Sequence, residues 1–167
     1  MSAFRFAAIR LAIVGLMIAI LAPAAFAYND AAALKGIKDG KIIFDVTAGS
    51  GKALLGRLKV IDETRDTLIK EGVTPYFILT FRGPATKLIQ SDLSKMAPKD
   101  RPYAAKIAAE LRKMGAQTGI VGLQQCAVAV REQHTNPKKV VPPVKVVGNA
   151  FVSLMAYEQK GYAYIQP

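Results

Sequence analysis

The sequence predicts an α/β fold with a mostly parallel, five-stranded, doubly wound sheet that carries helices on both faces. Short apolar segments at 41–47 and 76–81 are rich in β-branched or aromatic residues, which is typical of strands buried on both faces. Amphipathic segments, of which 52–71 is the longest, lie between the strands. Strands that alternate with helices of this length imply right-handed crossovers between parallel neighbours.

Several of the expected helices have a local signal at one end. Strands are expected at 41–47, 76–81, 117–123, 144–148 and 162–165. Helices are expected at 52–71, 85–93, 101–114, 125–133 and 151–160. Gly72, Gly115 and Gly161 stand where three of these helices end, as glycine often does. Asp100 is expected to cap the helix at 101–114, with Pro102 in its first turn.

The first 27 residues are typical of a secretory signal peptide. Arg5 and Arg10 form a positive start, and a 12-residue apolar run at 11–22 leads to an Ala-Phe-Ala cleavage signal at 25–27. A membrane span needs about 20 apolar residues, so the run is too short to favour an anchor. We expect cleavage after Ala27, a single domain at 28–167 with no membrane span, and a periplasmic or secreted location.

The composition favours one globular domain with a basic surface. Hydrophobic residues make up 51% of the chain and charged residues 21%, and the length suits one well-buried core. The net charge of +11 falls by two, to +9, when Arg5 and Arg10 leave with the signal peptide. The basic residues are scattered and match no nucleic-acid motif, so the charge favours acidic partners or anionic ligands rather than nucleic acid.

Cys126 is the only cysteine, so in an oxidising compartment it has no partner within its own chain. It is expected just beyond the strand at 117–123, where the next helix begins. A helix start favours the thiolate form of a cysteine, and the polar Gln124 and Gln125 suggest that this start is accessible. The apolar run at 126–130 favours the alternative that Cys126 is a buried core residue. Both interpretations remain open.

Gly49 and Gly51 precede a lysine at the start of the helix at 52–71 and invite comparison with a phosphate-binding loop. The Walker pattern fails, because Val46 stands where it needs glycine and Ala53 where it needs serine or threonine. The two glycines are still candidates for presenting backbone N–H groups to an anion. A plain tight turn is the alternative.

Arg82 ends the strand at 76–81, at the edge of the sheet where doubly wound folds bind ligands. It is a candidate for binding an anionic group, and it is equally suited to pair with Asp45 or Asp62.

No cofactor is expected. One cysteine and one histidine, His134, are too few ligands for a typical metal site, and no dinucleotide fingerprint is present. His134 lies eight residues beyond Cys126, on the far side of the expected helix, so a catalytic Cys–His pair is not expected either.

Four stretches together resemble the DsrE/DsrF-like family of small sulfur-relay proteins. They are KIIFDVT at 41–47, FILTFRGPATKL at 77–88, GLQQCAVAVRE at 122–132 and the segment at 144–165. The resemblance implies a flavodoxin-like fold and assembly into a homo-oligomer. It also implies that Cys126 matches the family cysteine that carries sulfane sulfur as a persulfide, received from a donor protein or passed to an acceptor protein.

The alternative function is a non-catalytic oligomeric binding module with Cys126 in its core. Homo-oligomer formation is expected in either case, because Phe151, Met155 and Tyr157 are apolar candidates for exposure on the helix at 151–160. A third hypothesis, that the protein binds a flavin or a nucleotide, rests on fold analogy alone.

Overall fold

The computed structural model describes residues 29–167, so the expected signal peptide and its cleavage site lie outside the described residues. Five parallel strands form one sheet in the order β4-β3-β2-β1-β5. The strands are β1 (Asp39–Val46), β2 (Thr74–Phe81), β3 (Ile120–Cys126), β4 (Lys145–Val147) and β5 (Ala163–Ile165). The prediction of a flavodoxin-like, doubly wound α/β fold is confirmed, with every strand pair of the sheet parallel.

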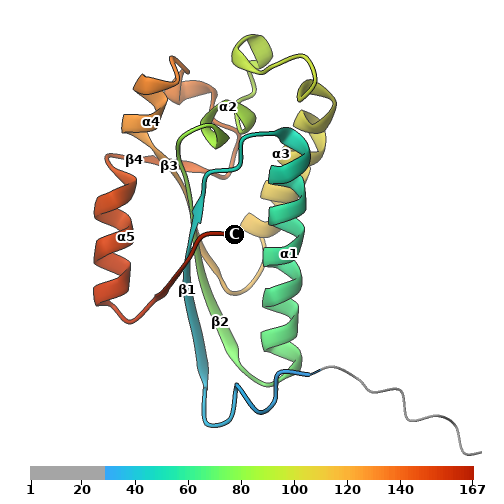
Figure 1. Ribbon diagram of the computed structural model, residues 1–167, viewed down its shortest axis with the longest axis vertical. Helices are drawn as coiled ribbons and strands as arrows, with labels where there is room; N and C mark the ends of the chain where they lie inside the picture. Colours follow the sequence, from blue (N-terminus) through green and yellow to red (C-terminus); the bar gives the residue numbers. More distant parts are fainter. Residues whose placement is uncertain (1–28) are drawn as a thin grey trace, which may run out of the picture.

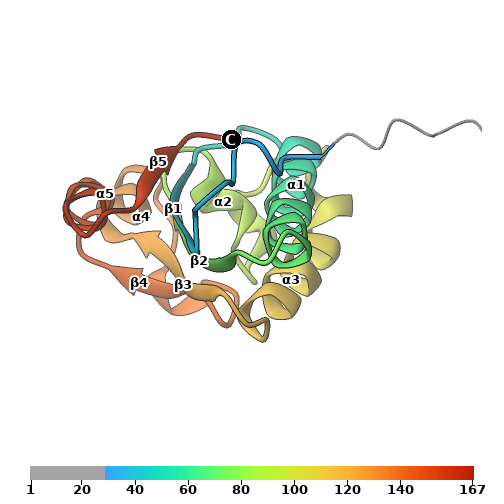
Figure 2. The ribbon, with the colours of Figure 1, turned by 90° about the horizontal axis from the view of Figure 1, so that it is seen from below.

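Helices cover both faces of this sheet (Figures 1 and 2). On one face lie α1 (Gly51–Lys70) and α3 (Arg101–Gly115), and on the other lie α4 (Ala127–Glu132) and α5 (Ala150–Gln159). A short α2 (Ala85–Leu88) follows β2, and two single-turn 3-10 helices follow at η1 (Leu93–Lys95) and η2 (Pro137–Lys139). Residues 29–167 contain no helix with both the length and the apolarity needed to cross a membrane.

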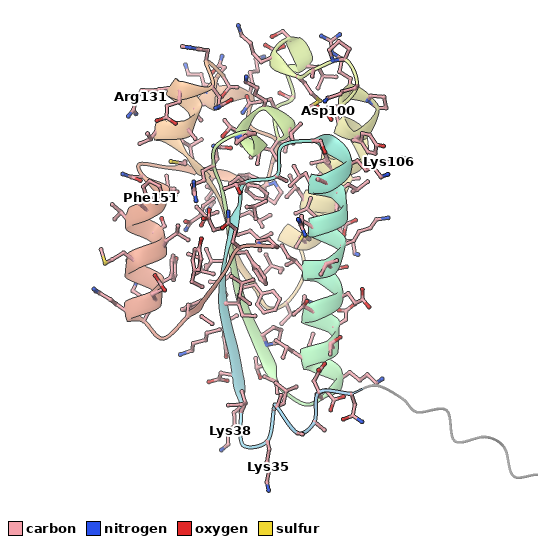
Figure 3. All side chains as sticks on the ribbon, viewed as in Figure 1. Lys35, Lys38, Asp100, Lys106, Arg131 and Phe151 are labelled. Atoms are coloured by element: carbon pink, nitrogen blue, oxygen red, sulfur yellow. The ribbon has the colours of Figure 1, made fainter. Side chains whose placement is uncertain are left out.

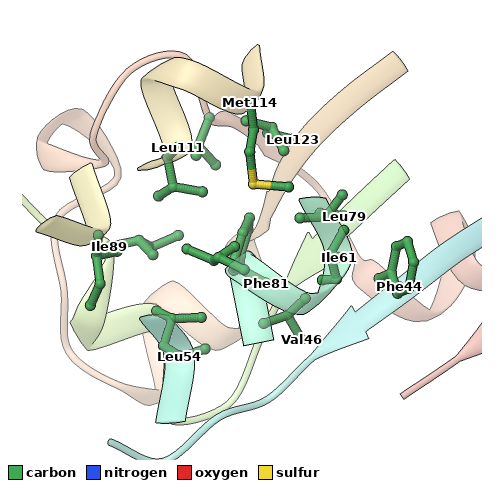
Figure 4. Packing of buried hydrophobic residues seen from close by; sticks show 14 of the residues in the cluster. Phe44, Val46, Leu54, Ile61, Leu79, Phe81, Ile89, Leu111, Met114 and Leu123 are labelled. Atoms are coloured by element: carbon green, nitrogen blue, oxygen red, sulfur yellow. The ribbon is translucent and has the colours of Figure 1, made fainter. Parts of the chain in front are cut away.

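The larger hydrophobic core lies between the sheet and the pair α1 and α3 (Figure 4). Phe81 and Leu79 of β2 pack there with side chains from both helices, among them Leu54, Ile61 and Leu111. The opposite face has a much smaller core, in which Ile43, Ile78 and Leu154 are buried. The two faces therefore differ: α1 and α3 are held by a broad apolar contact, whereas α5 rests on few apolar residues.

Two elements differ most from the sequence prediction. Strand β3 was expected at 117–123, but it begins at Ile120 and continues to Cys126. It is longer at its carboxyl end because Gln124 and Gln125 pair with Thr80 and Phe81 of β2, and Cys126 pairs with Val147 of β4. The single helix expected at 85–93 is replaced by the short α2, which ends because Ile89 leaves the helical conformation, and by the separate turn η1 after it.

Asp100 was expected to cap α3, but its side chain binds the start of α1 instead. It precedes α3, but its side chain makes no capping hydrogen bond there. Its Oδ1 instead accepts the backbone N–H of Gly51, the first residue of α1, at 2.8 Å. A Cβ atom at Gly51 would lie 2.9 Å from Cβ of Tyr103 and 3.0 Å from the carbonyl oxygen of Asp100. Glycine at this position therefore lets the starts of α1 and α3 meet closely.

Replacing Gly51 by alanine should destabilise the protein. The added methyl group would be forced against Tyr103 and Asp100, and overpacking of this kind costs about 1–3 kcal/mol. Gly56 is the matched control, because it lies in the same helix with no atom within 4 Å of an added Cβ. Gly56→Ala should leave the free energy of unfolding unchanged or raise it by up to about 1 kcal/mol. Urea denaturation measures both, and equal effects of the two substitutions would contradict the close contact.

Candidate functional site

Cys126 is the last residue of β3 and the N-cap of α4. Its side chain points to the face covered by α5 and is buried, with 4% of the residue exposed. Its apolar surroundings are small: Ala129, Ala150 and Val128 form a separate cluster around it. The buried thiol therefore lies among small apolar side chains at the carboxyl edge of the sheet.

The sulfur atom of Cys126 accepts a hydrogen bond from a helix start. The backbone N–H of Ala150, the first residue of α5, donates to Sγ at 3.3 Å. The next N–H, that of Phe151, donates to the side chain of the N-cap residue Asn149 at 2.9 Å. The first N–H groups of a helix have no partner within the helix, and they favour negative charge nearby. The sulfur thus caps α5, at a place where a thiolate is a better acceptor than a thiol.

The glutamine before Cys126 does not make the site accessible. Gln125 is fully buried, contrary to the expectation from its polarity. Its amide nitrogen lies 3.1 Å from Oγ1 of Thr86 and 3.2 Å from the carbonyl oxygen of Phe81. These partners replace water for the amide nitrogen, whereas Oε1 of Gln125 is buried without a hydrogen-bond partner within residues 29–167. The contacts of the nitrogen fix the ends of β2 and β3 relative to each other.

Arg82 forms an ion pair with Asp45, one of its two expected partners. Nε and one terminal nitrogen of Arg82 bind the two carboxylate oxygens of Asp45, which is fully buried. The hydroxyl of Tyr164 on β5 also donates to Asp45, at 2.8 Å. The hydrogen bond to Asp45 raises the pKa of Arg82 and that of Tyr164. The charge of Arg82 is therefore balanced inside the protein, and the cluster ties β1, β2 and β5 together.

Asp62, the other expected partner of Arg82, lies on α1 and interacts with α3 instead. It binds Lys113 and accepts a hydrogen bond from Gln117 at 2.7 Å. Burial raises the pKa of Asp62, but the hydrogen bonds from Lys113 and Gln117 outweigh this effect and lower it overall. Asp62 thus links the two helices of the larger core.

Arg82 and Cys126 contact neighbouring residues in the first turn of α5. The guanidinium of Arg82 lies 4.9 Å from the ring centre of Phe151, within the range of a cation–π contact. Phe151 follows Ala150, the residue that donates to Cys126, and Figure 3 labels Phe151 at the start of α5. The structure therefore brings these two candidate residues to one helix start.

The candidate glycines lie away from this pair. The N–H of Gly51 is taken by Asp100, and the N–H of Ala53 donates to Ser50 Oγ at 3.2 Å. The anion at the start of α1 is thus a carboxylate of the protein itself. Gly49 lies in the open loop before this helix, with no atom within 4 Å of its Cβ position.

His134 does not join the site. It is exposed, lies beyond α4 and has a left-handed backbone with a φ of 50°. The hydrogen bond to Sγ of Cys126 comes from Ala150 rather than from this imidazole. Within residues 29–167 no group of three or more His, Cys, Asp or Glu side chains is close enough to hold a metal ion.

Comparisons with known proteins support the fold. No family model matches the chain. An uncharacterized protein of Aquifex aeolicus is 27% identical over 125 residues, which are 75% of this chain and 55% of that protein, so the chain spans about half the length of this relative. The structure of MTH1491 from Methanobacterium thermoautotrophicum, a protein of unknown function, has a TM-score of 0.58 at 15% identity. It covers 77% of this chain and 100% of its own. This likeness shows a shared fold.

Replacing Arg82 by glutamine should strongly destabilise the protein, because Asp45 would stay buried without a cation. Breaking a buried ion pair in this way costs about 3 kcal/mol. Tyr164→Phe removes one hydrogen bond to the same carboxylate and should cost about 1 kcal/mol. Arg57→Gln, on the exposed side of α1, is the control and should have little effect.

Urea denaturation of each variant measures these differences. Adding Asp45→Asn to Arg82→Gln should recover part of the loss, since the unpaired charge is then removed. If Arg82→Gln were as stable as Arg57→Gln, the pair would not contribute to stability.

Proposed function

We propose that this protein is an exported sulfur carrier similar to the DsrE/DsrF-like proteins, acting in the periplasm or outside the cell. Cys126 would take up sulfane sulfur as a persulfide and pass it to a thiol of a partner protein. The observation that carries the proposal is the hydrogen bond from the first N–H of α5 to Sγ of Cys126. The N–H of Ala150 can donate to a thiolate at this place, and the thiolate is the form that attacks sulfane sulfur.

Both transfer steps balance without an added oxidant. In the first step, the Cys126 thiolate attacks the outer sulfur of a persulfide or polysulfide donor. A new S–S bond forms and the donor S–S bond breaks; a persulfide donor leaves as a thiolate, and a polysulfide leaves as an anion shortened by one sulfur. In the second step, a partner thiolate attacks the outer sulfur on Cys126, and the Cys126 thiolate is the leaving group.

The small surroundings of Cys126 support the carrier role. The alanine side chains at 129 and 150 are among the smallest that a protein can place beside a thiol. A buried position also limits the access of oxidants that would convert a persulfide to higher oxidation states in an oxidising compartment.

The proposal includes assembly into a homo-oligomer through the outer side of α5. Three large apolar side chains of α5 are exposed: Phe151, Val152 and Met155. Contiguous exposed apolar surface is typical of protein interfaces. Tyr157 was expected to share this surface, but it is half-buried and packs its ring against Tyr162 at 5.1 Å.

Incubation of the folded protein with a polysulfide should add one sulfur atom to Cys126, as measured by intact mass. A thiol acceptor added afterwards should remove this atom. Cys126→Ser retains an acceptor for the N–H of Ala150 and should fold, but it should gain no sulfur. Cys126→Ala is the second control and removes the acceptor as well.

An unreactive thiol in the folded protein would contradict the proposal. If Cys126 reacts with an alkylating agent only after unfolding, and the wild-type protein gains no sulfur, then the thiol is a core residue that caps α5. The binding-module alternative would then replace the carrier.

A charge on the outer side of α5 should dissociate the oligomer. Light scattering at micromolar concentration should report at least a dimer for the wild-type protein. Val152→Glu should shift the mass toward that of the monomer, because burying a carboxylate in an apolar interface is costly. Val60→Glu on α1 is the matched control, since the two valines are 57% and 58% exposed. A monomeric wild-type protein, or an oligomer that survives Val152→Glu, would contradict this interface.

A further inference from the structure

We propose a second binding site, for a small multivalent oxyanion, in the cavity between the loop before α1, the segment from α2 to η1, and the start of α3. The cavity has a volume of about 560 Å³, and its polar lining includes Lys87, Lys95, Arg101, Gly49, Ser94 and Gln133. This volume is within the range of small-molecule sites. The site lies at the carboxyl edge of the sheet, where open α/β folds bind ligands.

Three cations from three separate segments converge on this cavity. Lys87 comes from α2 and is half-buried, Lys95 comes from η1, and Arg101 is the first residue of α3. In the part of the chain that the structure describes, none of the three forms an ion pair. Like charges that gather without counter-charges repel one another, and a bound anion relieves this repulsion.

The nearby carboxylates do not neutralise the three cations. Asp100 is the one acidic residue in the lining, and its side chain is buried and already accepts the N–H of Gly51. Asp92 lies near Lys95, and hydrogen bonds that it accepts from Ser94 lower its pKa, with smaller contributions from Lys139 and Lys95. Asp92 is exposed to water, which screens its attraction for Lys95. An excess of positive charge therefore remains at the cavity.

The lining is partly organised before any ligand arrives. Nε of Arg101 donates to the carbonyl oxygen of Met96 at 3.3 Å, and Met96 is itself buried. This contact holds the direction of the guanidinium while using only one of its donor nitrogens. An arginine held in this way loses less conformational entropy when it binds an anion.

The chemistry of the lining selects the ligand class. Lysine and arginine side chains only donate hydrogen bonds, and Ser94 and Gln133 add neutral donors, whereas no aromatic side chain lines the cavity to stack on a base or a flavin ring. Several donors around one cavity match a ligand with several anionic oxygens, such as a diphosphate or a tricarboxylate. The lining does not include Cys126, so this site is independent of sulfur transfer.

Isothermal titration calorimetry at low ionic strength tests the site with pyrophosphate, citrate and acetate as probes. We expect saturable binding of one pyrophosphate or one citrate per chain and none of acetate, and the ratio of the two affinities distinguishes phosphate from carboxylate ligands. The double variant Lys87→Gln with Lys95→Gln should weaken binding at least tenfold. Lys95→Gln alone changes only an exposed side chain and should weaken it several-fold.

The matched control removes the same charge at the other end of the molecule. Lys35 and Lys38 lie there (Figure 3), so Lys35→Gln with Lys38→Gln should keep the affinity within twofold. Equal weakening by the two double variants would mean general charge attraction, and no saturable binding of pyrophosphate or citrate would mean no site; either result overturns the proposal. Cys126→Ser should bind like the wild-type protein, so a failure here is separate from a failure of the sulfur-carrier function.

Discussion

The parallel pairing of β2 with β3 up to Phe81 and Gln125 determines the arrangement of the whole carboxyl edge. Because successive residues of a strand point to opposite faces, Gln125 lies on the side of α1 and α3, and Cys126 lies on the side of α5. The same alternation turns Arg82 toward α5. A slip of one residue in this register would exchange the two sides and separate the thiol from the helix start that it caps.

Helix α5 depends on specific polar contacts more than on a broad apolar core. Beneath it, Asp45, Thr80 and Gln124 lie side by side across three strands, and the hydroxyl of Thr80 is buried without a hydrogen-bond partner within residues 29–167. Sγ of Cys126 holds the first turn of this helix. In the proposed function, an added sulfur atom would change that contact.

Much of the fold could be predicted from the sequence, because continuous apolar runs mark buried strands and amphipathic periods mark helices. Prediction failed where polar residues have distant partners. Gln125 was expected at the accessible start of a helix, yet it is buried, and its amide nitrogen donates to the carbonyl oxygen of Phe81 and the hydroxyl of Thr86. Asp100 has the sequence position of a cap for α3, but its partner is 49 residues away. Local patterns contain no information about such pairs, and the same holds for the three cations of the proposed oxyanion site.

The carboxylates of the protein itself decide which basic groups remain available to a ligand. The sequence offered Arg82, Gly49 and Gly51 as candidate anion sites beside other interpretations. In the structure, Asp45 and Asp100 already supply negative charge to Arg82 and to Gly51. An external anion at either place would have to displace a buried carboxylate, and this carboxylate would lose its partner. The cations around Lys87 face no such competitor. Although the chain has a net positive charge, basic side chains at this edge of the sheet can therefore attract an anionic ligand only where no carboxylate of the protein pairs with them.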